Sequence, residues 1–250
     1  MSRRGGALLL ALGVAACGGC ATPAGAAGRA RAVLFIGNSL TYTNDLPAIV
    51  QALADSSGER LRVEGRTAAG ASLADHWAMG TREALRERPW TVVVLQQGPS
   101  STSENRADLR AWTARWAQAI RAAGARPALY MVWPEAARTA AFPAVVESYT
   151  LAARDVDGLL FPAGAAWLAA WRRDAALPLY GPDEFHPSPT GSYLAALVVY
   201  ARLFDRSPVG LPARLRLTTG AIVAVDPARA ALLQAAAAEA AGVGVRAAPR

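Results

Sequence analysis

The chain has 250 residues, of which 53% are hydrophobic and 18% charged, and its formal net charge is +7. This length suits a single domain with a substantial core. All of its basic residues are arginines, and they fall mostly on expected helices instead of alternating with aromatic residues. The pattern excludes a recognisable nucleic-acid-binding surface and predicts at most a modest attraction to anionic surfaces.

The first residues have the composition of an export signal. Two arginines at positions 3 and 4 precede an apolar run at 7–16, which is too short to cross a bilayer as a permanent helix. We therefore expect a signal peptide at 1–16 and an exported protein, located in the periplasm or on the cell surface.

Residues 14–17, Val-Ala-Ala-Cys, resemble a bacterial lipoprotein box, in which cleavage precedes a cysteine that is then lipidated. We expect lipidation of Cys17, a small-residue tether at 17–28 and the folded domain at 29–250. The lipid would be the only membrane attachment. Ordinary signal cleavage between Cys20 and Ala27 is the alternative.

Cys17 and Cys20 are the only cysteines, and both precede the domain. The domain therefore offers no disulfide and no thiol nucleophile. Its two histidines are far apart in the sequence, so we expect no metal site and no cofactor.

Apolar patterns predict alternating strands and helices along the domain. Continuous or alternating apolar runs predict strands, and apolar residues at helical spacing predict helices. In chain order these are a strand at 33–36, a helix at 45–53, a strand at 60–66, a helix at 73–85, a strand at 91–96, a helix at 107–123, a strand at 127–132, a helix at 142–153, a strand at 158–161 and a helix at 230–241. The alternation predicts an α/β fold, a three-layer α/β/α sandwich around a parallel sheet of about five strands.

The first strand is followed by a serine. It ends at Gly37, and Ser39 follows at the turn, before a helix with Asp45 as a candidate N-cap. Ser39 therefore lies at the carboxyl end of the strand, the edge where open α/β sheets bind ligands. A simple turn or cap role is the alternative for this serine.

A loop near the other end of the chain offers partners for that serine. Asp183 lies three residues before His186, in a loop bounded by proline and glycine. An aspartate can hold an imidazole in one tautomer while the imidazole takes the proton of a serine hydroxyl. Ser39, Asp183 and His186 together supply a catalytic triad.

The early Gly-Asn-Ser-Leu at 37–40 and the late Asp-x-x-His-Pro at 183–187 resemble the SGNH, or GDSL-type, serine hydrolases, over roughly residues 32–203. Asn38 replaces the usual aspartate of the first motif. The family's Gly-x-Asn-Asp is absent, and the corresponding strand ends in Gln96-Gln97-Gly98, as in bacterial branches with glutamine there. The resemblance implies the three-layer SGNH fold, which is flavodoxin-like, and ester hydrolysis without a cofactor.

Acyl transfer also needs fixed donors for an oxyanion. The resemblance implies the backbone N–H groups of Ser39 and Gly70 and one side-chain amide. We favour Gln96 over Gln97 because it directly follows the apolar strand. An ordinary loop glycine and a strand-end cap are the alternative roles for Gly70 and the glutamine.

Three further residues are candidates for contact with the substrate, namely Asn44, His76 and Trp133. Each is expected close to the carboxyl edge of the sheet. A histidine beside a tryptophan on a helix is more often a packing residue, which is the alternative for His76.

The sequence therefore predicts an exported serine esterase that acts through an acyl-serine, with short acyl groups on a small-molecule or polysaccharide ester as the favoured substrate. Lipase-like or thioesterase-like hydrolysis is the alternative. A second hypothesis is a catalytically inactive, tethered carbohydrate-binding protein of the same fold, because the third motif is replaced. In a third, the triad residues do not meet.

Overall fold

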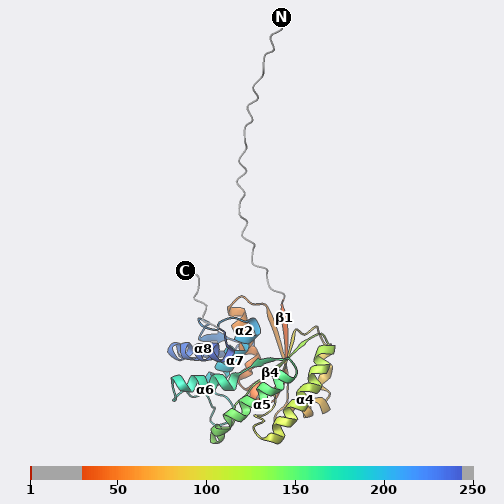
Figure 1. Ribbon diagram of the computed structural model, residues 1–250. Coiled ribbons are helices and arrows are strands. Elements are labelled where there is room, and N and C mark those ends of the chain that lie inside the picture. The colour runs from red at the N-terminus through yellow and green to blue at the C-terminus, as the bar shows by residue number, and fades with distance from the viewer. Residues whose placement is uncertain (2–29, 244–250) are drawn as a thin grey trace.

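The computed structural model describes residue 1 and residues 30–243 (Figure 1). The expected signal peptide, the tether and Cys17 lie outside the described residues, so these assignments stay predictions. In chain order the elements, with η for 3-10 helices, are β1 (Arg31–Gly37), α1 (Ser39–Tyr42), η1 (Thr43–Asp45), α2 (Leu46–Ser56), β2 (Leu61–Thr67), α3 (Leu73–Ala78), η2 (Thr81–Arg86), β3 (Val92–Leu95), α4 (Ser103–Ala122), β4 (Arg126–Tyr130), η3 (Ala136–Ala141), α5 (Phe142–Asp155), β5 (Leu159–Phe161), α6 (Ala163–Arg173), α7 (Pro189–Phe204), β6 (Arg214–Arg216), β7 (Ile222–Ala224) and α8 (Pro227–Ala241).

A five-stranded parallel sheet in the order β2-β1-β3-β4-β5 forms the centre of the molecule. From β1 the chain first moves to β2 on one side and then crosses to β3 on the other. The strand order therefore reverses between β1 and β3, and this switch point opens at the carboxyl ends of the two strands. The predicted α/β/α sandwich and its strand number are confirmed.

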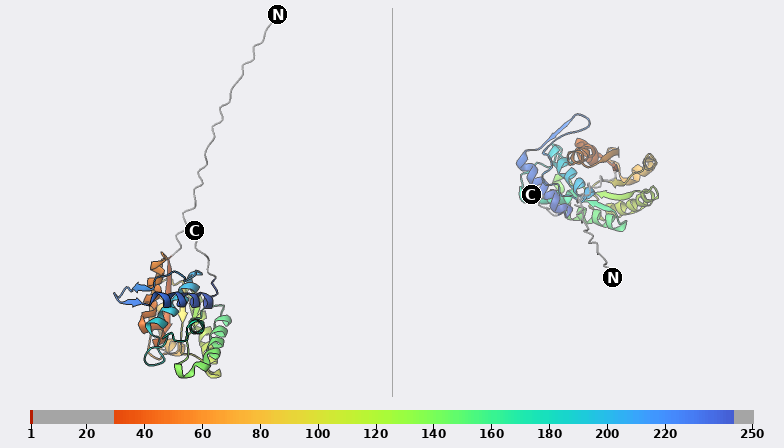
Figure 2. Two further views of the ribbon diagram at one scale, coloured as in Figure 1. Left: turned by 90° about the vertical axis from the view of Figure 1, so that its left-hand side faces the viewer. Right: turned by 90° about the horizontal axis from the view of Figure 1, so that it is seen from above.

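Helices cover both faces of the sheet. Helices α2 and α7 pack together on one face, and α3, α4 and α5 cover the other (Figures 1 and 2). Helix α8, expected on the outside, packs on α6 and α7. Strands β1 and β3 are enclosed between these layers: the side chains of 33–36 and 93–95 are fully buried. Their unbroken apolar runs reflect burial on both faces.

Some elements differ from the prediction. The expected helix at 73–85 is divided at Gly80, whose φ of +78° ends α3 before η2 begins. Helix α7 was not expected, because it is buried on nearly every side and so lacks a polar stripe. Helix α6 and the antiparallel pair β6 and β7 were also not expected; each of these strands has only three residues, too few to show an alternating pattern.

Within the described residues, no helix combines the length and the apolar character that crossing a bilayer requires.

Candidate active site

The end of β1 turns sharply into α1. Asn38 is the N-cap of this helix: its Oδ1 accepts the backbone N–H of Leu40 at 3.1 Å, and Ser39 is the first helical residue. A side chain at Gly37 would meet Oε1 of Gln96 at 2.4 Å and Oγ1 of Thr41 at 2.5 Å. Glycine is therefore required where β1 approaches the end of β3.

The amide of Gln96 is used inside the protein. Its Oε1 accepts the backbone N–H of Asn38 at 2.8 Å and the hydroxyl of Thr41 at 2.6 Å. Its Nε2 donates to Oδ1 of Asn38 at 2.9 Å and to the carbonyl of Gln97 at 2.7 Å. Both N–H bonds of this fully buried amide have protein acceptors. The preference for Gln96 as the oxyanion donor is therefore corrected.

Asn38 also connects β1 to the loop that contains Gly70. Its Nδ2 donates to the carbonyl of Ala71 at 3.1 Å, a bond that an ionised aspartate could not make. Gly70 has a φ of +68° and open space around its Cα. Within residues 30–243, no hydrogen-bond acceptor is found for the backbone N–H of Ser39 or of Gly70. These two donors are free to receive an oxyanion.

A cavity of about 310 Å³ opens at this switch point. Its lining consists of Asn38, Ser39, Gly70, Ala71, Ser72, Gln97, Gly98, Pro99, Ser100, Asn105, Asp108 and Phe185. Gln97 therefore borders the cavity, whereas Gln96 does not. The Gln97 Oε1 accepts the Leu73 N–H at 3.1 Å, while its Nε2 makes only long bonds, to Ser100 Oγ at 3.2 Å and Asp108 Oδ2 at 3.3 Å.

Asp183 and His186 contact each other on the loop before α7. His186 Nδ1 lies 2.5 Å from Asp183 Oδ2, and Asp183 Oδ1 accepts the backbone N–H groups of Phe185 and His186 at 3.2 and 3.0 Å. These bonds, above all the one from the His186 ring, lower the pKa of Asp183 to about 2. The carboxylate therefore stays ionised at neutral pH and can hold Nδ1 protonated. This leaves Nε2 as the nitrogen that can accept a proton.

Two side chains from other parts of the fold hold this loop in place. Asn44, shortly after Ser39, donates through Nδ2 to the carbonyl of Pro187 and to Oγ of Ser192, both at 2.9 Å. Trp133 Nε1 donates to the carbonyl of Phe185 at 3.1 Å. The Phe185 side chain then borders the same cavity as Ser39. Within the described residues, the Ser39 hydroxyl has no protein hydrogen bond, to His186 or to any other residue.

The three expected substrate contacts support the site instead of lining its cavity. Asn44 uses its amide on the loop, as above. Trp133 is fully buried and stacks on Trp167 with ring centroids 3.7 Å apart. The substrate role expected for these residues is therefore corrected for all three, His76 included.

His76 is buried beneath the end of β1. Its Nε2 lies 2.8 Å from the carbonyl of Gly37, and its Nδ1 lies 3.1 Å from Oγ1 of Thr81. Because a carbonyl can only accept, Nε2 carries the hydrogen. Burial lowers the pKa of His76, so the neutral ring is favoured. His76 is therefore a buried packing residue, which was the alternative role.

Several polar residues of the cavity were missed in the sequence. Asn105 and Asp108 lie in the first turns of α4, and Ser72 and Ser100 lie in loops after β2 and β3. Their position in the sequence could have identified them, because the loops and helix starts that follow parallel strands lie together at the carboxyl edge of the sheet.

The described residues contain no group of three or more His, Cys, Asp or Glu side chains that could hold a metal ion. The groups that this edge offers are a serine hydroxyl, an imidazole paired with a carboxylate and two unoccupied backbone N–H donors.

Comparison with solved structures gives clear matches. A protein from Slackia heliotrinireducens assigned to the SGNH hydrolases is 31% identical, with a TM-score of 0.58, over 70% of this chain and 100% of that one. A DUF4886 family protein from Bacteroides uniformis is 18% identical, with a TM-score of 0.71, over 85% and 95%. The acetyl xylan esterase AlAXEase is 14% identical, with a TM-score of 0.57, over 68% and 98%. No protein-family model and no curated protein matches.

Proposed function

The chain belongs to the SGNH hydrolases, and this membership supports ester hydrolysis as its general activity. We propose that it is an exported serine esterase. It removes short acyl groups, above all acetyl, from carbohydrate through an acyl-serine intermediate. The observation that carries the proposal is the cavity at the switch point, bordered by Ser39 and by the loop that holds the Asp183–His186 pair.

Ser39 is the nucleophile in this mechanism. Nε2 of His186 takes the hydroxyl proton as Oγ attacks the ester carbonyl, and the imidazolium then returns a proton to the leaving alcohol. Asp183 holds the ring in the required tautomer. Water then repeats the sequence on the acyl-serine, and the acid leaves. The missing hydrogen bond between Ser39 and His186 is compatible with this role, because such bonds are often long in unliganded enzymes and shorten in the substrate complex.

The oxyanion of the tetrahedral intermediate would be held by three donors. The backbone N–H groups of Ser39 and Gly70 have no acceptor within the described residues. Gln97 is the third donor, because its Nε2 makes only long bonds and can exchange one of them for the oxyanion. Fixed donors of this kind stabilise the charge that develops in the transition state.

The walls of the cavity support a small acyl group on a hydroxylated alcohol. Side-chain oxygens and amides of Ser72, Ser100, Asn105 and Asp108 surround the space next to Ser39. Such groups can hydrogen-bond sugar hydroxyls, whereas they offer a long acyl chain little apolar surface to bury against. The fold is shared with an acetyl xylan esterase, which is consistent with this substrate class. Lipid and thioester substrates are the alternatives.

The leader sequence supports the cellular location that we propose. The lipoprotein-box motif that ends at Cys17 supports export and a lipid anchor, with the domain in the periplasm or on the cell surface.

Hydrolysis of p-nitrophenyl acetate, butyrate and octanoate by a protein that begins at Gly28 tests the function. We expect acetate to be cleaved fastest, and Ser39→Ala and His186→Ala each to lower kcat by roughly 10⁴-fold or more. A preference for octanoate would favour a lipase. If the folded wild type cleaves no ester and no fluorophosphonate labels Ser39, the chain is a binding protein and the proposal fails.

A further inference from the structure

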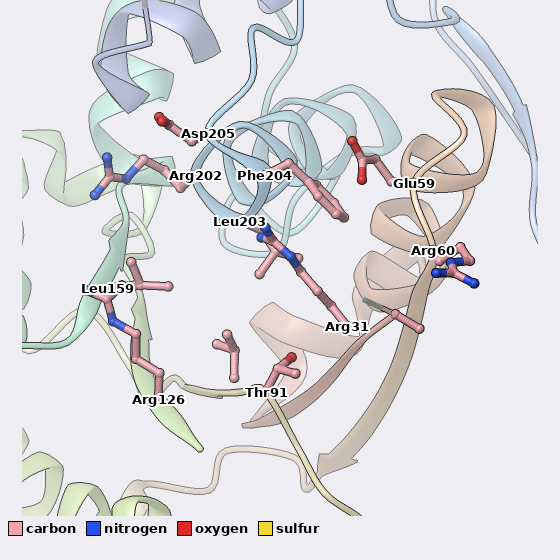
Figure 3. A pocket seen from close by; sticks show the side chains of 12 residues that line it. Arg31, Glu59, Arg60, Thr91, Arg126, Leu159, Arg202, Leu203, Phe204 and Asp205 are labelled. Atoms are coloured by element: carbon pink, nitrogen blue, oxygen red, sulfur yellow. The ribbon is translucent and has the colours of Figure 1, made fainter. Parts of the chain in front are cut away.

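A second hollow lies at the other edge of the sheet, at the amino ends of the strands. It encloses about 720 Å³. Its lining consists of Ala30, Arg31, Glu59, Arg60, Thr91, Val92, Arg126, Leu159, Arg202, Leu203, Phe204 and Asp205 (Figure 3). We refer to it as the arginine hollow. It shares no residue with the cavity beside Ser39, so the proposed reaction leaves it without a role.

Four arginines from separate elements surround this hollow. Arg31 begins β1, Arg60 precedes β2, Arg126 begins β4 and Arg202 lies in the last turn of α7. Figure 3 shows Arg126 and Arg202 on one side of Arg31 and Arg60 on the other, together with the two acidic residues of the lining. Their convergence from distant parts of the sequence explains why the chain shows no basic run.

In the part of the chain that the structure describes, the positive charge of three of these arginines, Arg31, Arg126 and Arg202, is not paired with a carboxylate. The Arg31 guanidinium lies over the Phe204 ring, 4.8 Å from its centroid. Arg202 donates to the backbone carbonyls of Leu160 and Ala241, at 3.2 and 3.4 Å, which are neutral partners. Among the ion pairs of residues 30–243, none involves Arg31, Arg126 or Arg202.

The hollow has two carboxylates, fewer than its four arginines. Glu59 pairs with Arg206, a residue outside the lining. Asp205 is the other acidic residue there. The hollow is therefore a net positive surface, and arginine forks of this kind bind phosphate oxygens well.

The described part of the domain begins at this hollow. Ala30, where the described domain begins, is part of the lining. Twelve residues lie between Cys17 and Ala30, and a flexible small-residue linker of that length would span about 20 Å on average. A lipid on Cys17 would thus hold the arginine hollow next to the headgroups of its own membrane.

We propose that the arginine hollow docks on anionic phospholipid headgroups of the membrane that carries the tether. The inference rests on the lipid anchor of the proposed function. Docking at the amino ends of the strands turns the opposite edge, with Ser39, away from the bilayer. The seven residues of β1 separate the two edges, which corresponds to about 20 Å. The catalytic edge then faces polymers outside the membrane.

Co-sedimentation with vesicles tests the docking without the lipid anchor. A protein that begins at Gly28 contains the whole described domain, so it is mixed with vesicles of phosphatidylcholine, with or without phosphatidylglycerol. We expect binding only to the anionic vesicles, weakened by added salt. The double variant Arg31→Gln/Arg126→Gln should bind roughly 25-fold more weakly, about fivefold for each arginine removed.

Two variants make the result interpretable. Arg126→Glu changes only an exposed residue, so it keeps the test valid if the loss of Arg31 harms folding. Arg229→Gln removes an exposed charge in the first turn of α8. This position is about 18 Å along the helix from Ala241, whose carbonyl contacts Arg202 of the hollow. The variant should therefore bind like the wild type.

Equal binding to neutral vesicles, no effect of Arg126→Glu, or an equal loss in Arg229→Gln would overturn the proposal. Binding of inorganic phosphate by a protein that does not bind vesicles would overturn it too, since the hollow would then bind a soluble anion. Hydrolysis of p-nitrophenyl acetate, measured on the same samples, shows separately whether the proposed activity holds.

Discussion

The backbone N–H of Asn38 donates to Oε1 of Gln96 at 2.8 Å, and Nε2 of Gln96 donates back to Oδ1 of Asn38 at 2.9 Å. This reciprocal pair joins the carboxyl ends of β1 and β3, the two strands that border the switch point. Asn38 extends the connection to the loop of Gly70 through the carbonyl of Ala71. The backbone donors proposed for the oxyanion therefore depend on one buried amide network.

Asn38→Asp tests that network. The substitution restores the residue that is usual in the family, but a carboxylate cannot donate to the carbonyl of Ala71. One buried acceptor loses its partner, and we expect a loss of about 1–3 kcal/mol in the free energy of unfolding. For a domain of this size this is a fall of about 2–4 °C in Tm for each kcal/mol. An unchanged or higher Tm in a thermal melt would show that the bond to Ala71 does not matter.

The two glutamines should separate into a structural and a catalytic residue. Gln97→Ala removes the proposed third oxyanion donor, so kcat should fall roughly 10²- to 10³-fold. Gln96→Ala leaves the groups that it pairs without partners, so its main effect should be a lower denaturation midpoint. Paired measurements of kcat and urea unfolding on both variants check this assignment. The reverse pattern would return the oxyanion role to Gln96.

The strands and the motif positions could be predicted because they depend on local patterns. The unbroken apolar run at 33–36 predicts a central strand, and those residues are fully buried. The turn after Gly37 predicts that Ser39 lies at the carboxyl end of that strand. The order of Gln96 and Gln97 could not be resolved, because adjacent residues at a strand end face opposite directions. Only the partner across the sheet, Asn38, decides which amide is enclosed.

Long-range hydrogen bonds also explain the misassigned substrate contacts. Asn44, His76 and Trp133 lie close in sequence to the carboxyl edge, which made them reasonable pocket residues. Each instead bonds a backbone carbonyl: that of Pro187, Gly37 or Phe185. Helix α7 was missed for a related reason, since a helix buried on nearly all sides carries no amphipathic signal.

Asn44 should act as a positioning residue for His186. Its φ of +56° is left-handed, so Asn44→Gly retains the backbone and removes only the amide that holds the carbonyl of Pro187. A displaced loop would misplace the base, and we expect kcat to fall roughly ten- to hundredfold.

Ser192→Ala is the matched control for Asn44. It removes the other acceptor of the Asn44 amide but keeps the bond to Pro187, so kcat should stay close to that of the wild type. Steady-state kinetics and a thermal melt on both variants separate misplacement from unfolding. Equal losses of kcat in the two variants would argue against the role of the bond to Pro187.

His76 should make stability depend on pH. Burial lowers its pKa below the ordinary value of 6.5, so in that range the unfolded chain binds more protons than the folded one. The stabilising contribution is therefore complete above pH 6.5 and is lost as the pH falls below it. Because the chain has only two histidines, His186→Ala leaves His76 as the sole imidazole. Urea unfolding of this variant between pH 8 and 5 should show a decline on acidification, and adding His76→Gln should flatten it. A decline that persists in the double variant would assign the effect to carboxylates instead.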